Sequence, residues 1–513
     1  CAIMVLHFKK KVGIDMLYIS TRGKSDMVSA SHAIASGLAS DGGLFVPKEL
    51  PHLSATEIQA MADAPYSSRA LTVLSRFLTD FSEAELKACI SKAYSKESFG
   101  VEIAPLHKVK NNVDVLELWH GPTSAFKDMA LQILPLFLTK AVAKTGEEKK
   151  LVILVATSGD TGKAALAGFA NVPGTEVIVF YPDQGVSQMQ KLQMITQAGV
   201  NVHVVAVKGN FDDAQTGVKI LFGDKDLAAQ LVQNGLAFSS ANSINWGRLV
   251  PQIVYYFSAY VDAMKTGRIK FGDKINFSVP TGNFGDILAG YFAKLMGLPV
   301  NKFICASNSN NVLSDFINTG TYNKNRPFRK TASPSMDILV SSNLERLLFE
   351  VTDHDGVQVS KWMEELREKG QYNVSKPIQD RILTDFFGTW VDEIETRETI
   401  GDVFNNYGYV MDPHSAVAYR ALEKYRLLTS DDRYSIVLST ASPFKFSNVV
   451  LNSIAPDVKL ADDNPFNAIK LLSEKGQIEA PAPLVALEKL PLLHNDVIEK
   501  NGLKAEIAKI LEL

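Results

Sequence analysis

The sequence predicts an α/β protein with mostly parallel sheets that are covered by helices on both faces. From about residue 100, apolar and β-branched runs of strand length alternate with segments of helix length. Strands that are apolar on both faces are typical of a parallel sheet buried between helices. The chain has 513 residues, more than one hydrophobic core usually covers, so we expect two or three domains.

The expected elements can be placed in order along the chain. Residues 50–100 have helical spacing with no strand between the helices, which predicts a mainly helical N-terminal region. The expected strands are VDVLEL (113–118), LVILVA (151–156), EVIVFY (176–181), VHVVAV (202–207), INFSVP (275–280), KFICAS (302–307), and a strand that ends in Ser439 and Thr440 within SIVLSTASPFK (435–445). Helical periodicity runs from Thr123 to Lys144 and again from about Thr161. The polar stretch 318–337 predicts a long loop, and the tail after about Asn464 returns to helix and short-strand patterns.

These patterns divide the chain into four parts. We expect a mainly helical domain at 16–105, a large α/β domain made of 106–150 and 245–513, and a small α/β domain at 151–244. In residues 1–15 a short apolar stretch precedes the lysines, which is the reverse of a secretory signal. We therefore expect these fifteen residues to be an upstream extension without a folded role.

The composition excludes several classes of partner. The formal net charge is −3, so no global basic field attracts nucleic acid or an anionic membrane. No apolar run is long enough to span a bilayer. Cys1, Cys89 and Cys305 are far apart and fit neither a metal-binding spacing nor a disulfide framework, which indicates a reducing compartment such as the cytoplasm. We expect a small-molecule ligand, no metal, and a monomer or weak homodimer.

Ligands of such folds bind at the carboxyl ends of strands, so the loops that follow the strands are the candidate sites. In HGPTSAFKDMA (120–130), Lys127 falls in the first turn of a helix. Rigid backbone at that place can aim its amine at a cofactor aldehyde. Taken alone, a lysine at a helix start is more often a solvated surface charge.

Two glycine-containing loops are candidate anion sites. ATSGDTGKAA (156–165) places the hydroxyls of Thr157, Ser158 and Thr161 at a helix start, and Gly159 lets a carboxylate approach backbone N–H groups. PTGNFGD (280–286) also lies between a strand and a helix and suits a phosphate cradle built from backbone amides. Either loop, taken alone, can be an ordinary capped helix start or a common glycine turn.

Two further strand ends carry polar side chains. In ANSINWGRL (241–249), Asn242, Ser243 and Arg248 can converge on a second anion, to which the guanidinium can bind through two hydrogen bonds. The alternative is a helix cap beside a surface arginine. Thr440 can hydrogen-bond a heteroaromatic nitrogen without adding a charge, or can satisfy the backbone of its own strand end.

Together, these features suggest a phosphorylated aldehyde cofactor and an anionic substrate, while other enzymes with phosphate ligands remain open. No GxGxxG follows a strand, and no GxxxxGK[ST] is present. The sequence therefore does not indicate the dinucleotide or nucleoside triphosphate sites that use those motifs.

The motifs resemble those of threonine synthase, a family of fold-type II enzymes that use pyridoxal 5′-phosphate. The resemblance covers nearly the whole chain from Met16, and the length and STRG opening are similar to the longer bacterial and fungal branch. The motifs that carry it are YISTRG (18–23), GLASDGGLFVP (37–47), HGPTSAFKD (120–128), TSGDTG (157–162), YPDQGVSQMQKLQM (181–194), NSINWGRLVPQ (242–252), PTGNFGD (280–286), SPSMDILVSSNLERLLF (333–349) and DPHSAVAY (412–419). The resemblance implies two doubly wound, mostly parallel domains of the tryptophan synthase β-like class.

The resemblance also implies roles for individual residues. Lys127 matches the Schiff-base lysine, and Thr440 matches the hydroxyl residue that faces the pyridine nitrogen. The loop for the cofactor phosphate corresponds to Gly282, Asn283, Phe284, Gly285 and Asp286. The loop around the substrate carboxylate and the cofactor's ring oxygen corresponds to Thr157, Ser158, Gly159, Asp160 and Thr161. The groups that hold the substrate phosphate correspond to Asn242, Ser243 and Arg248, together with Thr161. Family members often have HPAKF after the pyridine-facing Thr-Ala, whereas this chain has SPFKF, so Ser442 and Phe444 depart from the pattern.

The implied activity is that of a carbon–oxygen lyase that converts O-phospho-L-homoserine and water to threonine and phosphate, the last step of threonine biosynthesis. In that chemistry the lysine moves protons at Cα and Cβ, the cofactor delocalises the carbanion, phosphate leaves from Cγ and water adds at Cβ. Hinged closure of the two α/β domains is expected to exclude water until it is needed.

Three alternatives stay open. A threonine dehydratase or cysteine synthase would not need a second phosphate site, so Arg248 argues against both. A threonine-synthase-like phospho-lyase that acts on phosphothreonine and makes a 2-keto acid would share these motifs. A non-catalytic pyridoxal-phosphate-binding homologue would not need Lys127.

Overall fold

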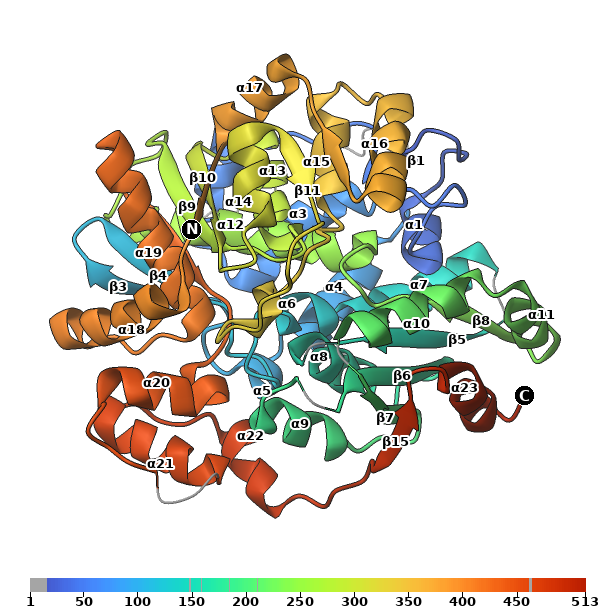
Figure 1. Ribbon diagram of the computed structural model, residues 1–513. Helices are drawn as coiled ribbons and strands as arrows, with labels where there is room; N and C mark the ends of the chain where they lie inside the picture. Colours follow the sequence, from blue (N-terminus) through green and yellow to red (C-terminus); the bar gives the residue numbers. More distant parts are fainter. Residues whose placement is uncertain (1–15, 147–148, 158, 184, 210, 461–463) are drawn as a thin grey trace, which may run out of the picture.

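The structure, a computed structural model, describes residues 16–146, 149–157, 159–183, 185–209, 211–460 and 464–513 (Figure 1). The expectation for residues 1–15 and the candidate Ser158 lie outside these ranges. Over the described part of the chain, no helix is both long and apolar enough to cross a membrane.

The N-terminal region is mainly helical, as the sequence predicts. Its elements are β1 (Tyr18–Ser20), α1 (Ala30–Ser36), β2 (Phe45–Pro47), α2 (Ala55–Ala60), α3 (Tyr66–Phe77), α4 (Glu83–Ala93) and α5 (Lys96–Phe99). α4 begins where the sequence predicts it because Ser82 and Glu85 form a capping box, in which each side chain accepts a hydrogen bond from the other residue's backbone N–H. Strands β1 and β2 pair antiparallel and were not predicted, because three residues are too few to show a period.

The larger sheet carries the first set of candidate loops. Counted over the described residues, it has six strands in the order β13-β10-β9-β14-β4-β3, and all neighbours are parallel except β3 and β4. Its strands are β3 (Leu106–Lys110), β4 (Val113–Glu117), β9 (Ile275–Pro280), β10 (Val300–Ser307), β13 (Phe386–Trp390) and β14 (Ser435–Ser439). These confirm the mostly parallel α/β class that the apolar runs predict.

Helices cover both faces of this sheet. The helices of this part of the chain are α6 (Asp128–Leu131), α7 (Leu134–Thr145), α12 (Trp246–Lys265), α13 (Gly285–Leu295), α14 (Val312–Thr319), α15 (Leu344–Val351), α16 (Gly356–Lys369), α17 (Lys376–Asp385), α18 (Glu393–Tyr407), α19 (Pro413–Thr429), α20 (Ser447–Ile454), α21 (Pro465–Gly476) and α22 (Ala482–Val485), with 3-10 turns η1 (Pro334–Met336), η2 (Pro443–Phe446) and η3 (Ala486–Lys489). On β10, Phe303 and Cys305 pack into the core that includes α12 and α13, while Ile304 and Ala306 pack against α18 to α20. This alternation is what a strand buried on both faces requires.

A second, smaller sheet carries the other candidate loops. It has the parallel order β15-β7-β6-β5-β8 among the described residues. Its elements are β5 (Lys150–Ala156), α8 (Asp160–Phe169), β6 (Thr175–Pro182), α9 (Gln188–Ile195), β7 (Val202–Lys208), α10 (Phe211–Gly223), α11 (Lys225–Gln233), β8 (Leu236–Ser239), β15 (Asp496–Glu499) and α23 (Leu503–Leu511). Val152 and Leu154 on β5 form a separate core with α10, α11 and α23.

The end of the chain differs from the expected division. We expected all of 245–513 in the large domain, but β15 pairs with β7 and α23 packs beside it in the smaller sheet's layer (Figure 1). The physical reason is that Leu503 and Ile507 of α23 complete the apolar core on that face of the smaller sheet.

Two local expectations also need correction. The helical pattern from Thr123 to Lys144 forms two helices, α6 and α7, and Pro135 lies in the first turn of the second, where its missing N–H costs no hydrogen bond. The predicted loop 318–337 contains a short strand, β11 (Thr321–Asn323), which pairs antiparallel with β12 (Gln371–Asn373). Tyr322 and Tyr372 stack across this pair with ring centroids 5.3 Å apart.

The strand order brings the candidate loops together. In the larger sheet β9, β14 and β4 are parallel neighbours, so the loops at their carboxyl ends lie at one edge. In the smaller sheet β5 and β8 are parallel neighbours in the same way. The loops after these five strands carry the sequence-predicted residues.

Candidate active site

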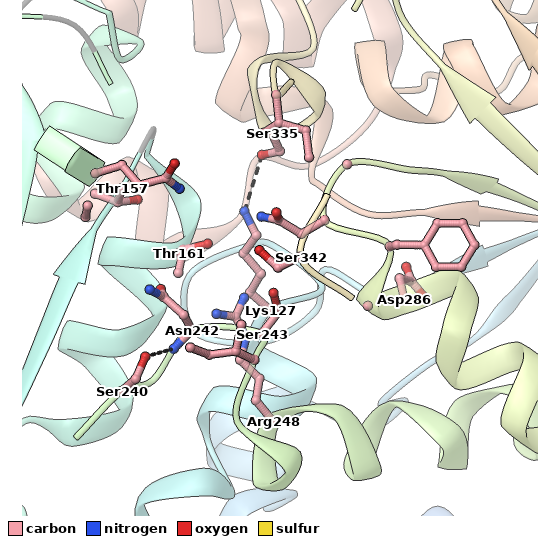
Figure 2. Close-up of a pocket in the computed structure, with 18 of the residues that line it drawn as sticks. Lys127, Thr157, Thr161, Ser240, Asn242, Ser243, Arg248, Asp286, Ser335 and Ser342 are labelled. Carbon is pink, nitrogen blue, oxygen red and sulfur yellow. Dashed lines mark hydrogen bonds between the residues drawn. The ribbon is translucent and has the colours of Figure 1, made fainter. Parts of the chain in front are cut away.

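A cavity of about 530 Å³ lies where the loops of the two sheets face each other. Of the residues singled out from the sequence, those that line it are Lys127, Thr157, Thr161, Asn242, Ser243, Arg248, Gly282, Asn283, Phe284, Gly285, Asp286 and Thr440. In Figure 2, Thr161 and Asn242 lie on one side of the Lys127 side chain and Asp286 lies on the other. Gly159 and Asp160 do not line the cavity, which is a difference from the expectation.

Lys127 is the central side chain of the cavity. It immediately precedes α6, and the adjoining Phe126 N–H donates to the carbonyl of Thr440 over 2.8 Å, which ties the lysine's segment to the end of β14. The side chain is buried, and burial lowers the pKa of the amine to about 8. Among the described residues its one hydrogen-bond partner is Ser335 Oγ, 3.4 Å from Nζ (Figure 2). The surface-charge alternative for Lys127 is therefore wrong.

Asp160 lies behind the cavity in a buried ion pair. Its Oδ1 is 2.6 Å from Lys445 Nζ and accepts a hydrogen bond from Gln190 Nε2 over 2.8 Å. Burial alone would raise the pKa of Asp160, but the ammonium groups of Lys445 and Lys127 hold it well below its usual range. Because Asp160 begins α8 and Lys445 lies in η2, the pair joins the smaller sheet's layer to the larger one.

The loop at the start of α8 uses its own polar groups to hold its shape. Thr157 Oγ1 accepts hydrogen bonds from the N–H groups of Gly159 and Gly162, each over 2.9 Å. Gly159 has φ 137°, and a Cβ there would lie 2.4 Å from the Gln190 side chain. Thr157 therefore lines the cavity with its acceptor capacity already used, and Thr161 lines the same cavity.

The loop before α13 has the form of an anion cradle. Phe284 takes a left-handed conformation, φ 63°, and within the described part of the chain no side chain caps the N–H groups of the first turn. Gly282 has no room for a Cβ, which would lie 2.6 Å from the Ser335 carbonyl oxygen. Asp286 Oδ1 accepts from the hydroxyls of Tyr255 (2.5 Å) and Tyr256 (2.9 Å), while burial raises the pKa of Asp286 to about 6. Its Oδ2 is buried with no protein partner among the described residues.

These groups fit pyridoxal 5′-phosphate, the cofactor that the resemblance implies. An aldehyde requires an amine with a substantial neutral fraction, and Lys127 provides one. A phosphate requires uncapped N–H groups, which the start of α13 provides. A ring nitrogen requires a neutral hydroxyl, and Thr440 lines the same cavity at the end of β14.

A valine in place of Gly285 is expected to weaken retention of pyridoxal 5′-phosphate about tenfold or more, equivalent to about 1.4 kcal/mol or more. A Cβ at Gly285 would lie 3.3 Å from Asn343 Nδ2, which donates to the Asn283 carbonyl oxygen and so holds the cradle. The two extra methyl groups of valine would displace Asn343. Equilibrium dialysis of the cofactor against Gly285→Val measures this, with Ala143→Val on the exposed face of α7 as the control. Unchanged retention would place the phosphate at another loop.

Arg248 is a buried cation without a carboxylate. It is 5% exposed, its Nη1 donates to the Ala241 carbonyl over 2.9 Å, and no acidic side chain in the described chain forms an ion pair with it. Burial lowers the pKa of the guanidinium to about 10. Asn242 and Ser243 lie beside it in the loop before α12 (Figure 2). Because an uncompensated buried charge is costly, this arrangement favours an anionic ligand at this side of the cavity.

Sequence reasoning missed three groups around Lys127. Ser335 and His414 line the cavity, and Lys445, which is fully buried, pairs with Asp160. Ser335 lies in the SPSMD motif and His414 in the DPHSA motif, both of which carry the resemblance. Those motifs were the available signal, because a lone serine or histidine indicates no role by itself. Ser442, which differs from the histidine that family members often have, caps η2. Its Oγ accepts a hydrogen bond from the Phe444 N–H over 3.4 Å.

Two family models match the chain. The one described as "Threonine synthase N terminus" matches residues 17–94, and the one described as "Pyridoxal-phosphate dependent enzyme" matches residues 98–368. The pyridoxal 5′-phosphate cofactor that the residues fit is therefore also the cofactor of the matching enzyme family.

Individual relatives agree with these models. A threonine synthase of Pseudomonas aeruginosa is 39% identical over 436 residues, which cover 85% of this chain and 90% of that protein. The human protein named threonine synthase-like 1 is also 39% identical, over 92% of this chain, but the chain spans only 62% of its length. The structure of a pyridoxal-phosphate-bound threonine synthase from Brucella melitensis superimposes with a TM-score of 0.84 at 35% identity, covering 97% of this chain and 99% of that one.

Proposed function

Because the chain belongs to the threonine synthase family of pyridoxal-phosphate-dependent enzymes, we propose that it converts O-phospho-L-homoserine and water to L-threonine and phosphate. The observation that carries the proposal is a pair of anion sites on either side of one buried lysine. The uncapped start of α13 serves the cofactor phosphate, and Arg248 serves a second phosphate. A pyridoxal-phosphate enzyme with an unphosphorylated substrate would have no use for the second site.

The side chains divide the work between holding and proton transfer. Lys127 holds the cofactor aldehyde and then acts as the base and acid that moves protons at the substrate's Cα and Cβ. Thr161, Asn242, Ser243 and Arg248 hold the leaving phosphate. When bound, pyridoxal 5′-phosphate supplies an electron sink for the negative charge at Cα. Phosphate departs from Cγ with its bridging oxygen, and the oxygen of water becomes the β-hydroxyl.

Closure of the smaller sheet's layer over the cavity is part of the proposal. Residues 151–244 carry Thr157 and Thr161, whereas Lys127 and the α13 cradle belong to the larger layer. Movement of one layer toward the other would bring the loops onto the substrate and exclude water. The Asp160–Lys445 pair, which joins the layers, supports a closed arrangement.

A second activity shares these residues. Release of phosphate without addition of water at Cβ, followed by hydrolysis of the resulting imine, would yield a 2-keto acid and ammonia. Relatives named threonine synthase and threonine synthase-like 1 are equally identical to this chain, at 39%. Incubation of the cofactor-loaded protein with O-phospho-L-homoserine distinguishes the two. We expect equal amounts of threonine and phosphate. Equal amounts of 2-keto acid and phosphate would establish the alternative.

We also propose a reducing compartment such as the cytoplasm and a monomer or weak homodimer as the working state. Cys89 and Cys305 are buried and form no disulfide, which supports a reducing environment. The proposed ligands are the cofactor and one small phosphorylated amino acid, with no role for nucleic acid or a membrane.

A further inference from the structure

The hydroxyl of Ser335 lies between two charged side chains beside the cavity. Ser335 Oγ is 3.4 Å from Lys127 Nζ (Figure 2). The same oxygen is 3.4 Å from Asp160 Oδ2. A hydroxyl can accept a hydrogen bond from an amine and donate its own hydrogen to a carboxylate at the same time, so Ser335 can serve both neighbours. This hydroxyl caps nothing in its own 3-10 turn, η1, so local backbone structure does not explain it.

The backbone of Ser335 is fixed on two sides. Its N–H donates to His414 Nε2 over 3.2 Å. Its carbonyl oxygen packs directly on Gly282 of the cofactor cradle, where a Cβ would lie only 2.6 Å away. The hydroxyl therefore has a set position relative to both the cradle and the lysine.

His414 is in turn held in one orientation. Its Nδ1 lies 2.7 Å from Asp412 Oδ1, and both side chains are buried. Because Nε2 accepts from a backbone N–H, the proton of the neutral ring is on Nδ1 and donates to Asp412. Asp412 is itself fixed as the N-cap of α19, and the His414 ring packs edge-on against Phe446 at 5.0 Å.

Buried polar groups hold the segment 331–337, which contains Ser335, against Asn308. Asn308 Nδ2 lies within hydrogen-bonding distance of Thr331 Oγ1 (2.9 Å), Ser333 Oγ (2.9 Å) and Asp337 Oδ1 (2.8 Å), which share its two N–H donors. These bonds close the segment at both ends of η1. A rigid segment is what a residue needs if it is to hold another side chain at a fixed distance.

We propose that Ser335 is a positioning residue that holds the amine of Lys127 whenever that amine is not joined to the cofactor, and that His414 and Asp412 fix Ser335 in place. The inference rests on the proposed role of Lys127. In the proposed reaction the lysine is released from the cofactor and must then stay near the substrate's Cα and Cβ. Ser335 provides an acceptor at that place, so the amine does not turn toward Asp160.

The amine faces other charges that must be included in any test. Asp160 on α8 raises the pKa of Lys127, while Arg248 on α12 and Lys445 on η2 lower it, and the neutral His414 of α19 lies behind Ser335. None of these is changed when Ser335 is replaced. A hydrogen bond to the charged form of an amine favours that form, so loss of the Ser335 hydroxyl should lower the pKa of Lys127.

The test is the pH dependence of Lys127 carbamylation by cyanate in the full-length chain freed of cofactor, with the modified lysine identified by peptide mass spectrometry. In Ser335→Ala the midpoint is expected to fall, so that the rate at pH 7 rises roughly two- to fivefold. Ser335→Thr keeps the hydroxyl and should restore the wild-type midpoint. Ser342→Ala, which removes a hydroxyl from the same cavity without a bond to Lys127, should leave the midpoint unmoved.

Two further variants test the support behind Ser335. His414→Leu removes the acceptor for the Ser335 N–H and should shift the midpoint in the same direction as Ser335→Ala. His414→Gln can place an oxygen near the position of Nε2 and should largely restore it. If the midpoint stays at the wild-type value or rises in Ser335→Ala, the proposal is overturned.

In the cofactor-loaded protein, Ser335→Ala should lower kcat roughly tenfold and leave KM within about twofold, because substrate binding does not use the hydroxyl. A KM effect with unchanged kcat would also contradict the positioning role. Failure of the proposed function, with no threonine formed, would leave the carbamylation result intact, so the two failures are distinguishable.

Discussion

Lys127→Ala is expected to abolish turnover while the fold is retained. The amine is buried in the cavity, and burial lowers its pKa to about 8. Among the described residues, the one other lysine that lines the cavity is Lys219 on α10. Loss of a general base alone costs about 10²- to 10⁴-fold, and loss of covalent attachment of the cofactor adds to that. Steady-state assay with O-phospho-L-homoserine should therefore detect less than about a hundredth of the wild-type rate.

The matched control is Lys92→Ala, which removes an exposed lysine from the last turn of α4. Its rate and circular dichroism spectrum should equal those of the wild type. A Lys127→Ala protein that keeps more than about a hundredth of the rate would show that another group is the base.

Arg248→Ala is expected to lower kcat/KM for O-phospho-L-homoserine. The loss of transition-state stabilisation should be about 2–5 kcal/mol, the range for removing one partner of a buried charge pair. The guanidinium has no protein carboxylate within the described chain, so the substrate's phosphate is the partner that it loses. Arg248→Lys keeps the charge but not the two-pronged geometry and should fall between the wild type and the alanine variant. Affinity for inorganic phosphate, measured by calorimetry, should fall in parallel.

A buried arginine on α3, which faces α12, provides the control. Arg69 packs against α12 but is paired with Asp262 over 2.7 Å, away from the cavity. Arg69→Ala should lower Tm and leave the KM of the folded protein unchanged. Wild-type phosphate affinity and turnover in Arg248→Ala would refute the second anion site.

The strands and the site loops were predictable because their signals are local. A run such as LVILVA is buried on both faces and has few other stable states, and β5 forms where it predicts. Once parallel strands are accepted, the loops at their carboxyl ends must meet at one edge, which is why Lys127 and Gly285 line one cavity.

What could not be predicted depends on contacts between distant segments. Strand β15 is mostly exposed and has no apolar run, and it pairs with β7 only because the two meet in the folded chain. Ser335 lies 208 residues from Lys127, and nothing in its own sequence marks its hydroxyl as the partner of the amine. Lys445 could not be distinguished from a surface lysine, because its burial follows from the pair with Asp160.

The central claim is that two anion sites flank Lys127. The site at Arg248 holds the substrate's phosphate, which leaves when the Cγ–O bond breaks. The most direct measurement is the reaction of the cofactor-loaded protein with O-phospho-L-homoserine in ¹⁸O-labelled water, followed by mass spectrometry of both products. The account predicts one labelled oxygen in the β-hydroxyl of threonine and none in the phosphate. Labelled phosphate with homoserine, or a 2-keto acid in place of threonine, would contradict it.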